Sequence, residues 1–120
     1  MKGIVVTTDM KIEVKDFAEP PYKTIGETVG GYIEIVHPMG LRGAVMVVND
    51  DGTIHSLPLN VIGSCLYGTQ THRIPIVGNV VIMKEGYVNG ERGLIGLEDS
   101  EIEPLLEQLN QLKGYFEKRR

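Results

Sequence analysis

The order of apolar and polar positions predicts a chain made mainly of short strands up to about residue 97. Residues 10–16 alternate, with Met10, Ile12 and Val14 on one side and charged residues on the other, which predicts a half-buried strand. Residues 44–49 are almost continuously apolar, which is typical of a central strand. The predicted strands are residues 2–9, 10–16, 32–38, 44–49, 53–59, 76–84 and 93–97.

Two short helices are predicted between these strands. Apolar residues in the segment 22–29 follow a helical spacing, and Gly30 supplies a left-handed stop. Asn60 is expected to cap the second helix, which places Cys65 on an apolar face. Gly68 is expected to end this second helix.

A longer amphipathic helix is predicted at about residues 100–118. Ser100 and Glu103 match the S-x-x-E capping box, and Pro104 is compatible only with the first turn. This helix either packs on the chain's own sheet or extends into an oligomer interface, and the sequence leaves both open. Its apolar stripe consists of Ile102, Leu105, Leu106, Leu109, Leu112 and Phe116.

Together these elements predict the α+β class: a mostly antiparallel β-sheet with short helices and a C-terminal amphipathic helix packed on one face. No repeat, linker or low-complexity segment interrupts the pattern. The length of 120 residues fits a single domain over residues 1–120, with the sheet core in about 1–97.

Composition and charge narrow the range of partners. The formal net charge of −4 argues against nonspecific nucleic-acid binding, which needs a basic surface. The single cysteine, Cys65, excludes an intrachain disulfide and suits a reducing compartment. No apolar run approaches the roughly 20 residues that span a bilayer. We therefore expect a soluble cytoplasmic protein, with no nucleic acid and no membrane among its partners.

Five motifs occur in an order that resembles a known family. They are VGGYIEIV (29–36), VVNDDG (47–52), LPLN (57–60), LYG (66–68) and PIVGNVVIM (75–83). In this order and spacing they resemble a family of small phage, plasmid and bacterial proteins that is catalogued as a domain of unknown function (number thirty-eight forty-six). The resemblance covers about residues 1–84 and implies an accessory protein of a phage or mobile element, working in a bacterial cytoplasm. It implies no reaction and no catalytic residue.

No catalytic, metal or cofactor site is predicted from the residues themselves. Cys65 is expected to be a small buried hydrophobic residue, and a dyad with His55 or His72 stays open as the alternative. The three histidines, which include His37, are far apart in the sequence and form no metal-binding pair. The glycine-rich segment 90–96 lacks the lysine of a phosphate-binding loop.

The segment 69–73, Thr-Gln-Thr-His-Arg, is the main candidate for ligand binding. It carries hydroxyls, an amide, an imidazole and a guanidinium but no carboxylate, and arginine binds phosphate and carboxylate groups well. Two further arginines in glycine-flanked loops could converge on the same anion, within a monomer or across an oligomer interface. The alternative is that each arginine is a solvated surface charge. The candidate ligand-binding residues are Arg42, Tyr67, Thr69, Thr71, His72, Arg73 and Arg92.

These observations leave three functions open. The first is a non-enzymatic protein that binds and sequesters a small anionic ligand, such as a signalling nucleotide of the host's immune response to phage. The second is a module that inhibits or modulates a host protein through its acidic surface and terminal helix. The third is a small hydrolase built on Cys65 or His72. We expect the first function, without a cofactor and with the protein as a homo-oligomer.

Overall fold

The computed structural model of the chain describes residues 1–52, 55–68 and 74–119, and it confirms the α+β class. Its strands form one six-stranded sheet in the order β2-β1-β5-β4-β3, and β6 pairs with β5. Every pairing between these strands is antiparallel. The strands are β1 (Lys2–Val6), β2 (Ile12–Asp16), β3 (Ile33–Val36), β4 (Val45–Asn49), β5 (Val80–Val88) and β6 (Glu91–Ile95).

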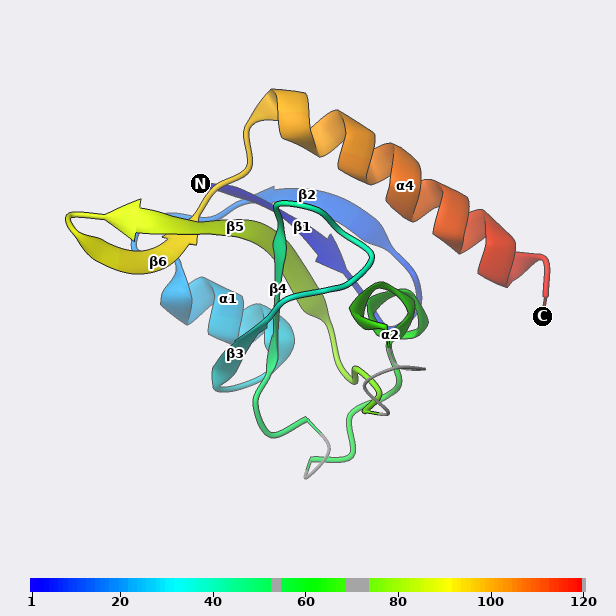
Figure 1. Ribbon diagram of the computed structural model, residues 1–120. Helices are drawn as coiled ribbons and strands as arrows, with labels where there is room; N and C mark the ends of the chain where they lie inside the picture. Colours follow the sequence, from blue (N-terminus) through cyan, green and yellow to red (C-terminus); the bar gives the residue numbers. More distant parts are fainter. Residues whose placement is uncertain (53–54, 69–73, 120) are drawn as a thin grey trace.

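Helices cover both faces of this sheet (Figure 1). On one face, α1 (Tyr22–Val29) contributes Ile25 to a buried apolar cluster. On the other face, α2 (Val61–Tyr67) and α4 (Asp99–Glu117) contribute to a second cluster, which includes Leu109. The inner strands supply both clusters because successive side chains of a strand point to opposite faces.

Asn60 fastens α2 to the sheet and confirms the predicted helix cap. Its Oδ1 atom accepts a hydrogen bond from the Gly63 N–H group at 2.8 Å. Its Nδ2 atom donates to the carbonyl oxygens of Val6, at 3.0 Å, and Gly78, at 2.9 Å. The side chain is fully buried, so these bonds replace the water that an exposed amide would contact. At the other end, Gly68 terminates α2 with φ +87°, as predicted.

The predicted return strand at 53–59 is wrong over the part that the structure describes. His55 and Ser56 lie in a turn, and Leu59 makes one isolated bridge with Val77. The reason is competition for β4, whose two edges pair with β3 and β5 and leave no place for a third neighbour.

The glycine-rich stretch before α4 is a hairpin rather than a loop followed by a short strand at 93–97. β5 continues to Val88, and β6 returns from Glu91. Asn89 and Gly90 form the two-residue turn, with φ values of +52° and +80°. An Asn-Gly pair is a strong signal for this kind of turn, so the hairpin was detectable from the sequence.

The exposure of Cys65 contradicts its prediction as a buried residue. α2 directs Ile62 and Leu66 into the core instead, together with Ser64. The Ser64 hydroxyl donates to the Ile76 carbonyl oxygen at 3.1 Å and accepts from the Ile76 N–H group at 2.9 Å. These bonds fix the rotation of the short helix and leave the cysteine on its outer side.

α4 begins at Asp99, and its capping residues lie two positions earlier than predicted. The Glu101 carboxylate accepts a hydrogen bond from the Glu98 N–H group at 2.9 Å. The apolar stripe packs on the chain's own core, where Ile102 and Leu109 are buried. Further members of the stripe pack against the same cluster while partly exposed: Leu105, Leu106, Leu112 and Phe116.

Candidate functional site

The loop that carries Arg42 is fastened to the C-terminal end of α2. The Gly40 N–H group donates to the Leu66 carbonyl oxygen at 2.8 Å. A side chain on Gly68 would approach the sulfur of Met39 to 2.7 Å, so these two segments are in close contact. The structure therefore places the Arg42 loop beside the point where the chain enters the predicted ligand segment 69–73, which itself lies outside the described residues.

A cavity of about 520 Å³ lies between the Arg42 loop and the first turns of α4. Its walls are largely apolar and include Leu97, Pro104 and Leu105. Its acidic residue, Glu101, is paired with the Lys84 ammonium at 2.8 Å. That hydrogen bond, together with one from the backbone of Glu98, holds the pKa of Glu101 below its usual value.

The Arg42 side chain is the charged group of this cavity that lacks a counterion. Within the described ranges, no acidic side chain forms an ion pair with it. It is exposed, and glycines lie at positions 40 and 43 of its loop. The Gln108 side chain donates to the Gly40 carbonyl oxygen at 2.8 Å and ties the loop to α4 as well. An anion that entered the cavity would therefore share it with one arginine that is not ion-paired in the described chain and with apolar lining residues.

Tyr67 is the last residue of α2 and lines a smaller cavity of about 180 Å³. Two carboxylates, Glu34 and Asp50, also line that cavity. Burial raises the pKa of Glu34, and the neighbouring Asp50 raises it further. The described part of this cavity therefore carries negative charge, which opposes the binding of an anion there.

Arg92 lies on β6 and forms an ion pair with Glu85. Its Nη2 atom is 2.9 Å from the Oε1 atom of Glu85, and the Nε2 atom of His37 is 3.1 Å from the same oxygen. The hydrogen bonds from Arg92 and His37 lower the pKa of the Glu85 carboxyl. This cluster joins β5, β6 and the segment after β3, and its residues are too far apart in the sequence to be recognised there.

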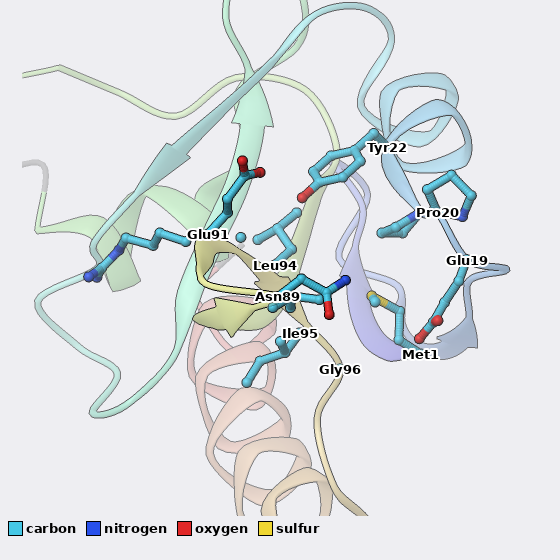
Figure 2. Close-up of a pocket in the computed structure, with 13 residues that line it drawn as sticks. Met1, Glu19, Pro20, Tyr22, Asn89, Glu91, Leu94, Ile95 and Gly96 are labelled. Atoms are coloured by element: carbon cyan, nitrogen blue, oxygen red, sulfur yellow. The ribbon is translucent and has the colours of Figure 1, made fainter.

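A third cavity, here called the β6 groove, was not foreseen from the sequence. It has a volume of about 620 Å³ and is lined by residues 88–89 and 91–96 on one side and by Met1 and residues 19–22 on the other. Figure 2 shows Tyr22 and Pro20 across this space from β6, with Glu19 beside Met1. Apolar residues beside an edge strand could have indicated this groove from the sequence. That inference required the β5–β6 hairpin to be assigned first.

The predicted binding residues are therefore divided among three places in the described chain. The loop of Arg42 and the helix end at Tyr67 are brought together, although the two residues line different cavities. Arg92 lines the β6 groove and does not share a cavity with either of them. The remaining candidates fall outside the described residues: Thr69, Thr71, His72 and Arg73.

No group of three or more His, Cys, Asp or Glu side chains within 1–52, 55–68 and 74–119 is arranged to hold a metal ion. In the same ranges, no helix combines the length and apolar character needed to cross a membrane.

Comparison with protein families assigns the chain to a family. A family model described as "Domain of unknown function (DUF3846)" matches residues 1–110. The match includes the five motifs and most of α4, so the chain belongs to this family. No curated protein and no solved structure matches the chain.

Proposed function

We propose that this member of the DUF3846 family is a non-enzymatic protein that binds a small anionic ligand at the Arg42 loop. The observation that carries the proposal is that Arg42, which forms no ion pair with the other described residues, lines a largely apolar cavity. Arginine forms paired, charge-assisted hydrogen bonds with phosphate and carboxylate groups, and these are stronger than bonds between neutral groups. The apolar wall would cover the uncharged part of the same ligand.

The charge balance favours this cavity over the other two described above. The cavity at Tyr67 contains the two carboxylates of Glu34 and Asp50. The β6 groove contains Glu19 and Glu91, and its arginine is paired with Glu85. In the Arg42 cavity the acid is neutralised by a lysine, which leaves the charge of Arg42 available. An anion entering there meets attraction without a compensating repulsion.

The specific ligand we propose is a signalling nucleotide of the host's anti-phage response, which the protein would sequester. A nucleotide combines phosphate with a flat, weakly polar base, and the cavity offers a cation beside an apolar wall. The segment 69–73 follows Gly68 directly in the sequence and contains hydroxyl, imidazole and guanidinium groups, which suit a phosphate ligand. Sequestration needs affinity alone, so it requires no catalytic group. The proposal includes a homo-oligomer in a bacterial cytoplasm.

The first test is native mass spectrometry of the protein purified from its bacterial host, followed by the same measurement after denaturation. We expect an anionic small molecule that is released on denaturation. Thermal unfolding with cyclic nucleotides and ADP-ribose as probes then measures affinity, because a ligand at 100 times its Kd raises the free energy of unfolding by about 2.7 kcal/mol.

The matched variants are Arg42→Ala and Arg119→Ala. We expect Arg42→Ala to weaken binding by about 10- to 100-fold, because it removes a hydrogen bond to a charged group. Arg119 is exposed and stacks on Tyr115 near the end of α4, 3.9 Å from the ring centre, so its replacement should leave the affinity unchanged. Equal effects of the two variants, or an unmodified mass without any shift in melting, would contradict the proposal. The binding of a host protein would then become the leading function.

A further inference from the structure

The outer edge of β6 carries backbone groups that pair with no strand in the described chain. β6 is hydrogen-bonded to β5 alone. The two-residue turn makes Val88 and Glu91 the hydrogen-bonded pair that closes the hairpin. Such pairs alternate along an antiparallel ladder, so Arg92 and Leu94 direct their N–H and C=O groups away from β5. An edge of this kind is a template for a further strand.

The β6 groove follows this edge. Every residue from 91 to 96 lines it, although successive side chains of a strand point to opposite faces. A cavity over one face would contact alternate residues, so this cavity runs along the side of the strand. Figure 2 shows that Glu91, Leu94 and Ile95 border the space opposite Tyr22 and Pro20.

The opposite wall of the groove contributes no strand to this edge in the described chain. It contains Pro20 and Pro21, which have no N–H group to donate to a ladder. Tyr22 stands over β6, with its hydroxyl 3.1 Å from the position that a side chain on Gly93 would take. About half of the tyrosine side chain is exposed, so the groove is bordered by a ring that another chain can contact.

The uncompensated charge of the groove is negative. The amino group of Met1 is 2.9 Å from Asp16, and Arg92 is 2.9 Å from Glu85, so both cations are paired. Glu19 and Glu91 form no ion pair with any other residue that the structure describes. An occupant that carries lysine or arginine would therefore be attracted to the groove.

From these observations we infer that the β6 groove binds an extended basic segment of a partner protein, which adds as a strand to the edge of β6. β6 has five residues and spans about 17 Å, so it can pair with a segment of similar length. Main-chain hydrogen bonds to Arg92 and Leu94 would hold the segment. Apolar side chains would contact Tyr22 and Leu94, and basic side chains would lie near the two glutamates. This site is separate from the Arg42 cavity.

The test uses an acetylated peptide of alternating Lys and Val, roughly eight residues long, which is the probe with the inferred chemistry. Amide shifts of the ¹⁵N-labelled protein are followed by NMR during titration. We expect the largest shifts at Arg92 and Leu94, and weaker binding at high salt. The control peptide has the same sequence with N-methyl groups on alternate residues, which should weaken binding by about tenfold because two hydrogen bonds are lost.

Two protein variants test the contribution of the charge of the groove. Glu19→Gln with Glu91→Gln should weaken binding of the Lys-Val peptide about three- to tenfold and reduce its dependence on salt. Glu107→Gln on the exposed side of α4 is the matched control and should have no effect. The inference is overturned if the N-methylated peptide binds equally well, if the shifts lie away from β6, or if about 2 mM peptide causes none.

Discussion

The two halves of β5 belong to one strand but lie in different surroundings. Residues 80–83 are fully buried, pair with β1 on one side and β4 on the other, and contribute to both apolar clusters. Residues 84–88 pair with β6 alone in the described chain. At their end, Tyr87 is 74% exposed and Val88 is 48% exposed, and the hairpin projects from the body of the molecule (Figure 1).

Within this single strand, the first half contributes to stability and the second half is accessible to solvent. Burial of apolar side chains stabilises the first half, whereas a two-stranded ribbon is only marginally stable in water. The exposed end of the hairpin therefore adds little to the free energy of unfolding, whereas Leu94 of β6 is buried in the core. Changes at the exposed positions of the hairpin can be used to test binding because they should not unfold the protein.

The largest expected difference between the two halves is in amide hydrogen exchange. Val81 pairs with Val5 and Val47 in the middle of the sheet, so its amide should exchange only through global unfolding. Val88 lies next to the hairpin turn and should exchange through local opening. We expect the Val81 amide to exchange at least about 1,000-fold more slowly, which corresponds to the lower part of ordinary domain stabilities. Similar rates, measured by NMR after transfer to D₂O, would show that the hairpin is part of the cooperative core.

A smaller difference is expected in the effects of truncating one apolar side chain in each half. Ile82→Ala should lower the free energy of unfolding by about 2–5 kcal/mol, because it leaves a cavity in a fully buried cluster. Val88→Ala should change it by less than about 0.5 kcal/mol. Urea unfolding measures both variants, and an unchanged m-value shows that the unfolded surface is the same. A loss of more than 1–2 kcal/mol in Val88→Ala would remove the distinction between the halves, since roughly that size marks a packed contact.

The structural predictions that were confirmed concern elements that residues close together in the sequence determine. Asn60 caps its helix through Gly63, three residues away, so the local pattern contained the information. The apolar run of β4 corresponds to a strand that is buried along its whole length. In both cases the neighbouring residues dictate the structure. The hairpin after residue 84 was also encoded locally, by Asn89 and Gly90, but the spread of glycines favoured a loop.

The other differences depend on partners that are distant in the sequence. The segment after β4 is not a strand where it is described because β5, thirty or more residues later in the chain, occupies that edge. The outward position of Cys65 follows from the bonds between Ser64 and Ile76. In the candidate site, Arg42 was predicted from its residue type, whereas the hydrogen bond between Gly40 of its loop and Leu66 of α2 depends on the fold. The β6 groove depends on the placement of Tyr22 against Gly93, which no spacing in the sequence indicates.

The smallest expected effect concerns Glu85, which lies just after the boundary between the two halves. Its folded-state pKa is lowered, chiefly by the hydrogen bond from Arg92 and then by His37. A lowered folded-state pKa stabilises the fold at pH values above the unfolded-state pKa of about 4.3. This stabilisation is lost as the pH falls through the folded-state pKa. Glu85→Gln should therefore be less stable than the wild-type protein at about pH 6, and this difference should shrink toward about pH 3.

We expect the difference at the higher pH to stay below about 1 kcal/mol, because Arg92 and His37 are largely exposed and solvent screens the pairs. Urea unfolding of both proteins across this pH range gives the difference directly. Glu91→Gln, a neighbouring acid without an ion pair in the described chain, is the control and should show no such dependence on pH. A difference for Glu85→Gln that is constant with pH would mean that the cluster does not hold the base of the hairpin. The hairpin would then owe its orientation to other contacts, which include the packing of Leu94 in the cluster beneath α1 and the ion pair between Lys84 and Glu101.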